Sequence, residues 1–290
     1  MSLFPALRSA VYRPQRAIRA TTGSHFRTLT TPSPVALADV RPGPALSQTN
    51  KAEITLRRFW KHVHIQPQPS GGHVVTLDHR NLKTPGGKLL LIPQSQRLLA
   101  TLIANEWENQ DEVLKQHALP LTSLASRALD SLTDPAIHAG VIDALLKYLD
   151  TDTICYPSDE PPNLALKQEQ HWKPLFKWLK TTYKVDLRTA HGLSPAKQSA
   201  ETKQILRSVV EDMDIWELAA FERAVYASKS FVIALALCKH RLTANEASDA
   251  AHVEVRSQIE KWGEVEDTHD VDFHDIRRLL GSVSCLLVKS

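Results

Sequence analysis

The sequence predicts an α+β fold, in which a small β-rich N-terminal part is followed by a larger, mainly α-helical part. Two observations lead to this prediction. Residues 56–92 hold short segments of apolar and polar side chains with Gly, Pro, Asn and Asp between them, which is typical of strands joined by tight turns. From Ser95 onward, apolar residues recur at three- and four-residue spacing, as in amphipathic helices. Strands and helices that are segregated along the chain favour α+β.

The β-rich part is expected to be a meander of three short strands. Residues 59–65 alternate between apolar and polar side chains, and residues 74–77 and 88–92 are largely apolar. The polar corner Asp78-His79-Arg80-Asn81 is typical of a turn. The glycine pairs Gly71-Gly72 and Gly86-Gly87 suit hairpin corners, and an anion cradled by their backbone is the less favoured alternative.

The first helix is expected to start at Ser95, a suitable N-cap. Trp107 ends its apolar stripe and should anchor the helix on the β-rich part. The stripe consists of Leu98, Leu99, Leu102, Ile103 and Trp107. Further helices are expected at residues 121–132, from Asp134-Pro135 onward, and through residues 171–178. In the last of these, Pro174 marks a kink or a join between two helices.

The C-terminal half continues the helical pattern with two ambiguous segments. Residues 184–187 are a candidate short strand. Residues 276–288 are ambiguous, and their second half, residues 283–288, fits either a strand or a buried helix. Three more helices are expected: one from Ser194-Pro195 to about Asp212, one over residues 214–241, and one capped by Thr243 that ends near Glu266. The second of these is apolar around much of its circumference, so it should be central in its domain.

The first forty residues predict a mitochondrial transit peptide, because five arginines precede the first acidic residue, Asp39, in a Ser-, Thr- and Ala-rich segment. We therefore divide the chain into a transit peptide and start of linker (1–40), a linker (41–55), a β-rich domain with one helix (56–115) and a mainly helical domain (116–290). Without the five arginines the net charge falls from +3 to −2. The mature chain is therefore not basic, which argues against nucleic-acid binding.

Cysteine usage and hydropathy exclude several classes of protein. The three cysteines are far apart and form no CxxC pair, which argues against a disulfide framework and a zinc site. The longest apolar run, residues 231–238, is much shorter than the ~20 residues that a membrane span needs. Signatures of dinucleotide, P-loop and hydrolase sites are also missing from the sequence. We therefore expect no cofactor, and for His62 and His64 a half-exposed strand face rather than a metal site.

An acid-rich segment near the C-terminus is the candidate functional site. Eight acidic residues between positions 254 and 275 are opposed by only two basic ones, and Trp262-Gly263 lies among them. Such a run is commonly a solvated face, but it also suits a divalent cation or a basic partner. Glu266 and Asp267 are expected at a helix C-terminus, where the helix dipole disfavours carboxylates, and such a local conflict favours a functional role.

Short motifs in a fixed order resemble the ATP synthase mitochondrial assembly factor 2 family. They are Arg58-Phe59-Trp60-Lys61, Gly71-Gly72, residues 77–85, residues 106–110, residues 120–124, residues 148–156, Trp172-Lys173-Pro174-Leu175, Lys229-Ser230 and residues 258–263. The resemblance covers about residues 56 to 275. Each motif is short, but their joint order is highly specific.

The resemblance implies a chaperone and not an enzyme. Members of this family are thought to hold the unassembled alpha subunit of the ATP synthase catalytic sector in the mitochondrial matrix until the beta subunit replaces them. A functional acidic residue in the C-terminal helical region is also implied, and Glu266 is the nearest match. The candidate partner-binding residues are Trp262, Gly263, Glu264, Glu266, Asp267 and Asp270. We expect the free chain to be a monomer.

Two other classes of function remain open on the sequence. One is a carboxylate-metal small-molecule hydrolase built on residues 254–275, and the other is a generic matrix scaffold. Bound metal or turnover in the purified protein would favour the hydrolase.

Overall fold

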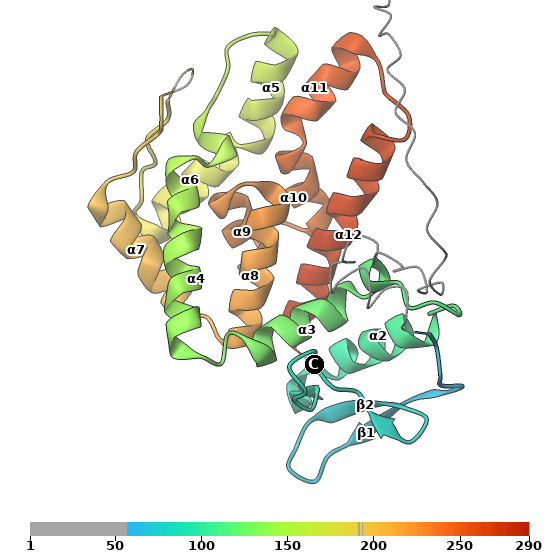
Figure 1. Cartoon of the computed structure of the whole chain (residues 1–290). Helices are drawn as coiled ribbons and strands as arrows, with labels where there is room; N and C mark the ends of the chain where they lie inside the picture. The colour runs from blue at the N-terminus through green and yellow to red at the C-terminus, as the bar shows by residue number, and fades with distance from the viewer. Residues whose placement is uncertain (1–56, 191, 193, 290) are drawn as a thin grey trace, which may run out of the picture. The chain divides into compact units, whose positions relative to one another are not determined.

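The structure is a computed structural model that describes residues 57–190, 192 and 194–289. The expected transit peptide and linker lie outside the described residues. The strands are β1 (Val63–Pro67), β2 (His73–Leu77), β3 (Arg80–Asn81) and β4 (Leu91–Ile92). The helices are α2 (Arg97–Glu108), α3 (Pro120–Asp130), α4 (Pro135–Lys147), α5 (Pro162–His171), α6 (Lys173–Tyr183), α7 (Ala200–Glu211), α8 (Ile215–Ser228), α9 (Phe231–Cys238), α10 (Ala244–Ala251), α11 (Val253–Trp262) and α12 (His269–Leu287). Short 3-10 turns are η1 (Gln94–Gln96), η2 (Gln116–Ala118), η3 (Tyr148–Asp150) and η4 (Thr153–Cys155). This order confirms the α+β prediction (Figure 1).

The sheet is antiparallel throughout, with β2 paired to each of the other three strands. Its first strand begins at Val63, later than expected, because the backbone N–H groups of Lys61 and His62 donate to the Asp78 carboxylate at 3.1 and 2.9 Å. Asp78 itself has a φ of +53° and makes the predicted corner between β2 and β3. A carboxylate therefore takes the place of a neighbouring strand at this end of β1.

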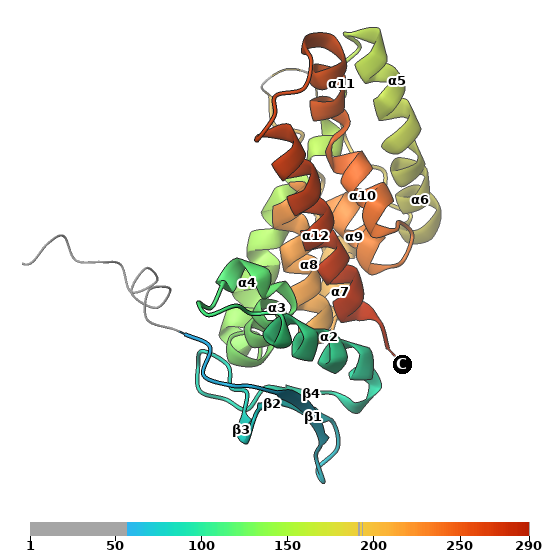
Figure 2. The ribbon, with the colours of Figure 1, turned by 90° about the vertical axis from the view of Figure 1, so that its right-hand side faces the viewer.

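Helix α2 packs on the sheet, and Figure 2 shows the strands lying against it. The helix begins at Arg97 and not at Ser95, because η1 precedes it. The Trp107 ring lies 5.2 Å from the Trp60 ring, and Trp107 Nε1 donates to Thr122 Oγ1 at 3.0 Å. The predicted anchoring of the helix by Trp107 is confirmed. Because α2 also contacts α3 and α12, it links the sheet to the helices; the division into two domains at residue 115 stays a prediction.

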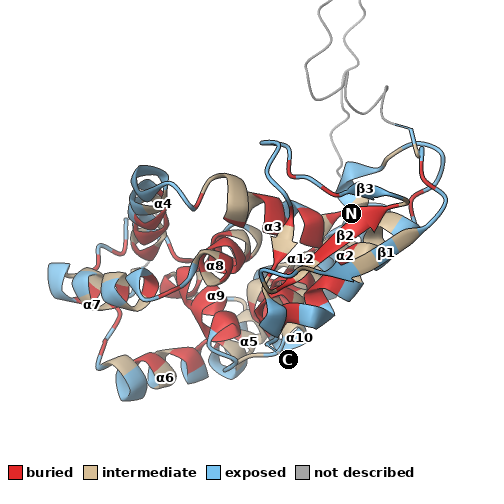
Figure 3. Ribbon diagram, turned by 90° about the horizontal axis from the view of Figure 1, so that it is seen from below, coloured by how far each residue is buried: buried red, intermediate tan, exposed pale blue. Residues whose placement is uncertain are grey.

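Helices α8 and α9 form the centre of the helical part, and all eight residues of α9 are buried (Figure 3). The single helix expected over 214–241 is wrong, because the chain breaks at Lys229, which has a φ of +54°. Ser230 caps α9, and the buried Asp152 carboxylate accepts from Val232 N–H at 3.0 Å. A side chain remote in sequence thus stabilises the break.

Five further expectations need correction or completion. Residues 184–187 are not a strand: Val185 and Leu187 are buried, but they pair with no other strand. Helix α7 starts at Ala200, capped by Ser199, and not near Ser194. The helix expected up to Glu266 breaks at His252 and ends at Trp262. Residues 276–287 are helical and form the end of α12. The segment around Pro174 is divided into two helices, α5 and α6. Within the described residues, no helix combines the length and apolar composition of a membrane span.

Candidate partner-binding site

The acid-rich segment, residues 254–275, includes most of α11, the turn that follows it and the start of α12. The turn lies at the end of the α11–α12 pair, beside α5 in Figure 1. Helix α11 ends at Trp262, where Gly263 takes a φ of +89° and its N–H donates to the Ile259 carbonyl at 2.8 Å. The following turn is closed by His269, whose Nδ1 accepts from Val265 N–H at 3.0 Å. The segment therefore has a defined turn that connects the two helices.

The expectation that Glu266 and Asp267 lie at a helix C-terminus is wrong. Both residues lie in the turn after the end of α11. Asp270 and Asp272 lie in the first turn of α12, where the helix dipole favours carboxylates. The conflict with a helix dipole therefore gives no support for a functional role of this segment. Such a role has to rest on the contacts of its side chains.

The four carboxylates among the predicted site residues are exposed, and the described part of the chain supplies no partner for them. Glu264, Glu266, Asp267 and Asp270 make no ion pair and no side-chain hydrogen bond with another described residue. Three of their acidic neighbours are paired: Glu260 with Lys167 at 2.6 Å, Asp272 with His252 at 3.0 Å and Asp275 with Arg278 at 2.6 Å. Some carboxylates of the acid-rich segment thus form ion pairs within the fold, whereas the four predicted site carboxylates are available to a partner.

Large apolar side chains are exposed among these carboxylates. Trp262 is 71% exposed, Val265 57% and Val271 58%. Lone exposed apolar residues are ordinary on a protein surface, but several within one acidic segment mark a surface suited to a partner. We call residues 262–271 the α11–α12 surface. It combines apolar contact area with negative charge, which is suited to a basic and partly apolar partner.

The α11–α12 surface is supported by ion pairs beneath it. Helix α11 is tied to α5, since Glu260 pairs with Lys167 and accepts from Asn163 Nδ2 at 3.2 Å. Helices α10, α11 and α12 meet at the Asp249 carboxylate, which accepts from Arg256 at 2.5 Å and Arg277 at 2.7 Å. These bonds tie α11 to α5 and join both α11 and α12 to α10, so the exposed groups are presented on a fixed support.

A groove of about 670 Å³ adjoins this surface, between the start of α12 and the loop before α3. Glu106 lines it together with Asp270 and Val271. The Glu106 carboxylate accepts the N–H groups of Leu121 and Thr122 at 2.7 and 2.9 Å, and burial raises its pKa. Glu106 therefore caps the start of α3. The sequence reasoning missed this role, for which the motif at 106–110 is the only signal.

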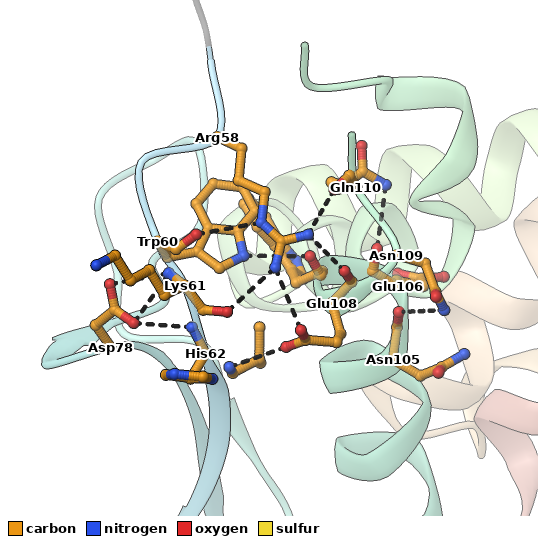
Figure 4. A network of polar contacts seen from close by, with 12 residues as sticks. Arg58, Trp60, Lys61, His62, Asp78, Asn105, Glu106, Glu108, Asn109 and Gln110 are labelled. Atoms are coloured by element: carbon orange, nitrogen blue, oxygen red, sulfur yellow. Dashed lines mark hydrogen bonds and ion pairs between the residues drawn. The ribbon is translucent and has the colours of Figure 1, made fainter. Parts of the chain in front are cut away.

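The contacts of Arg58 show that the motif Arg58-Phe59-Trp60-Lys61 supports the fold (Figure 4). Its guanidinium donates to the carbonyls of Glu108 and Gln110 at 2.7 and 2.6 Å, and it also reaches the Trp60 carbonyl at 3.2 Å. The Glu108 carboxylate in turn accepts from Val63 N–H at 3.0 Å. These bonds join the start of β1 to the end of α2, so the motifs at 58–61 and 106–110 hold the sheet on its helix.

Two other candidate sites from the sequence can be compared with the structure. The His62 and His64 rings lie 6.2 Å apart, and no group of three or more metal-ligating side chains lies together in the described part of the chain. The turn with Gly86-Gly87 does hold an anion, but it is the chain's own Asp130 carboxylate, which accepts from Gly86 N–H at 2.8 Å and Thr84 Oγ1 at 2.6 Å. The carboxylate-metal hydrolase therefore has no ligand set within the described residues.

Comparison with known proteins adds independent findings. The model of the family described as ATP12 chaperone protein matches residues 57–180. The mitochondrial protein atp12 of Schizosaccharomyces pombe is 35% identical over 240 residues, which cover 80% of this chain and 82% of that protein. The mitochondrial protein ATP12 of Saccharomyces cerevisiae is 31% identical over 283 residues, covering 84% and 87% of the two chains. The crystal structure of Atp12 from Paracoccus denitrificans superposes with a TM-score of 0.67 at 31% identity, covering 80% of this chain and 100% of that one.

Proposed function

The chain belongs to the ATP12 chaperone family, and from this premise we propose that it is an ATP synthase assembly chaperone that binds the unassembled alpha subunit. The motif resemblance supports the choice of partner. An unassembled subunit exposes the apolar surface that its neighbours normally cover, which is an aggregation hazard. A chaperone that covers this surface has to bind its partner and release it, and it does not have to catalyse a reaction.

The α11–α12 surface is the observation that carries the proposal. Its unpaired carboxylates, Glu264, Glu266, Asp267 and Asp270, pair with arginine or lysine side chains of the alpha subunit. Trp262 supplies the apolar anchor, because its side chain is large and exposed. Desolvation of these groups on binding gives the contact its specificity, and the beta subunit then displaces the chaperone by competing for the same partner.

The place of action in this proposal is the mitochondrial matrix. The arginine-rich segment 1–40 is the import signal, and the two yeast relatives are mitochondrial proteins by name. The mature chain acts as a monomer, with a β-rich domain (56–115) joined to a helical domain (116–290).

A binding experiment tests the proposal. The chain lacking residues 1–40 is mixed with purified alpha subunit, and light scattering and gel filtration follow aggregation and complex formation. We expect a one-to-one complex that keeps the alpha subunit soluble and that dissociates when beta subunit is added. Hydrogen exchange should show protection of residues 262–271 in the complex.

Three outcomes separate the classes of function. Suppressed aggregation with protection at the α11–α12 surface supports the chaperone. Bound metal or turnover of small esters by the purified chain would favour the hydrolase instead. A chain that binds many matrix proteins and shows no preference for the alpha subunit would be a scaffold.

A further inference from the structure

A groove of about 760 Å³ runs along α6, on elements different from those of the α11–α12 surface. Its apolar lining is supplied by Pro174, Phe176 and Trp178, and its basic lining by three lysines of α6 and Arg241. Arg241 comes from the connection between α9 and α10, which brings a residue from a distant part of the sequence to α6. We call this feature the α6 groove.

The three lysines form a regular stripe. Lys173, Lys177 and Lys180 are spaced by four and three residues, so they lie on one face of α6, and all three are exposed. Leu175 and Leu179 lie on the other side of the helix and are buried. The stripe therefore extends over about 10 Å of helix at 1.5 Å per residue.

Ion pairs inside the groove leave two cations without an ion-pair partner among the described residues, although Arg241 also attracts the Glu246 carboxylate at longer range. Lys173 pairs with Glu169, and Lys180 pairs with Asp186 at 2.6 Å. Lys177 and Arg241 pair with no carboxylate in the part of the chain that the structure describes. An occupant that carries carboxylates would find two cations available for ion pairs beside an apolar wall.

A buried donor next to the groove also lacks an acceptor. A second hollow of about 380 Å³ shares Lys173 and Phe176 with the α6 groove and is lined by Gln168. Gln168 is only 6% exposed, and its Oε1 accepts from Ser158 N–H at 3.0 Å. This bond fixes the orientation of the amide, and Nε2 is left without a partner in the described part of the chain.

We propose that the α6 groove binds an acidic amphipathic helix of a partner protein. Carboxylates at three- or four-residue spacing on that helix pair with Lys177 and Arg241, and its apolar face covers Phe176 and Trp178. The contact is separate from the alpha-subunit contact and does not depend on it.

The charges in the groove favour such a helix over a polyanion. Glu169 and Asp186 lie in the same lining and would repel the closely spaced phosphates of a nucleic acid or of an anionic membrane surface. A protein helix avoids this repulsion, because it places its few carboxylates at Lys177 and Arg241 and neutral groups elsewhere.

Peptide binding to the chain lacking residues 1–40 tests the proposal. The probe is a labelled synthetic helix of about 18 residues, or five turns, with leucines on one face and glutamates at four-residue spacing. Fluorescence anisotropy measures its dissociation constant. We expect binding that weakens with salt, and a loss of roughly tenfold or more in the charge-reversed variant K177E/R241E. The matched variant R97E/K147E reverses two exposed cations outside the groove and should bind like the unmodified chain.

Several results would overturn the proposal. One is equal binding of a peptide with glutamine in place of glutamate. Another is an unchanged dissociation constant in K177E/R241E, or no measurable binding of the acidic peptide at all. Stronger binding of single-stranded DNA or of phosphatidylserine vesicles at the same two cations would assign the groove to a polyanion instead. The neutral variant K177Q/R241Q repeats the test without added negative charge, and its melting temperature shows whether the fold is intact.

Discussion

The junction of sheet and α2 and the α11–α12 surface are both rich in charged and aromatic residues, yet they differ in what these residues touch. At the junction, Arg58 and Glu108 satisfy backbone groups of a neighbouring element, and Trp60 packs on Trp107. At the α11–α12 surface, Glu266 and Trp262 contact solvent. The comparison teaches that most of the recognisable motifs hold the fold, whereas the surface left for a partner is marked by exposed groups. Among the described residues, Glu266 has no ion pair, and the contact of Trp262 is with its neighbour Lys261, whose ammonium lies 4.9 Å from the ring centroid.

The motif at 148–156 extends this lesson to the helical part. Asp152 is fully buried and bonds to the start of α9, and Thr153 Oγ1 donates to the Lys229 carbonyl at 3.0 Å. Two motifs that are far apart in sequence are therefore the two sides of one contact. The motif at 258–263 differs from these, because it leads from the paired Glu260 into the exposed surface.

The largest effect is expected for Trp107→Arg, which breaks the junction of sheet and α2. The substitution removes the ring contact with Trp60 and the bond to Thr122, and it places a charge against the core. We expect a loss of roughly 3–5 kcal/mol in the free energy of unfolding, or insoluble protein. Chemical unfolding followed by circular dichroism measures it.

Trp107→Phe is the matched control for this prediction. It keeps an aromatic ring beside Trp60 and loses only the indole N–H, so a much smaller loss of about 1 kcal/mol is expected. An unchanged melting temperature in Trp107→Arg would show that the packing at this junction contributes little to stability.

Glu266→Lys should weaken binding to the alpha subunit and leave the fold intact. The side chain has no partner among the described residues, so its loss costs no internal bond. Removing one member of a desolvated interfacial pair costs roughly 2–5 kcal/mol of binding free energy. Calorimetric titration with the alpha subunit, alongside thermal unfolding, measures both quantities.

Glu201→Lys is the control for charge. Glu201 is an exposed acidic residue at the start of α7, outside the α11–α12 surface, and it makes no ion pair with another described residue. It should bind like the unmodified chain. Full binding by Glu264→Lys, Glu266→Lys and Asp270→Lys together would remove the surface from the proposed interface.

The buried Asp152 carboxyl should make the free energy of unfolding depend on pH. Burial raises the pKa of its carboxyl from 3.8 to about 6. The folded state therefore holds the proton more tightly than the unfolded state, so stability falls as pH rises from about 4 to about 6 and is constant above that range. The change amounts to about 3 kcal/mol for two pKa units.

The variant Asp152→Asn isolates this contribution, because other carboxyls titrate in the same range. Denaturant unfolding at several values between pH 4 and pH 7 is compared for the two chains. We expect the difference between them to vary with pH and to level off above about pH 6. A constant difference would mean that Asp152 has the same pKa in the folded and unfolded states.

The sequence predicted elements where local signals agree with the fold, and it failed where distant residues decide. Asp134-Pro135 starts α4 as expected, since Asp134 caps its own helix. By contrast, α7 starts late because Gln198 N–H donates to Asp150 at 2.9 Å, which holds the preceding residues outside the helix. The break at Lys229 likewise depends on Asp152. Neither contact leaves a periodic pattern in the sequence.

The candidate site shows the same division. The acidic composition of residues 254–275 and the position of Trp262 could be read from the sequence. Which carboxylates pair within the fold could not, because their partners, such as Lys167 and His252, lie on other helices. The end of α11 at Gly263 was also missed, although a glycine is a common helix stop.

The smallest expected effect separates two residues within the α11–α12 surface. Asp270 lies in the first turn of α12, where a carboxylate interacts favourably with the helix dipole, whereas Glu266 lies in the turn before it. Asp270→Lys should therefore lower the free energy of unfolding by roughly 0.3–1 kcal/mol at low salt, and Glu266→Lys should leave it unchanged. Because salt screens this interaction, the difference between the two variants should shrink at about 1 M salt. Paired urea titrations at both salt concentrations measure it. Equal stabilities at low salt would show that Asp270 does nothing for α12, and its carboxylate would then belong wholly to the proposed binding surface.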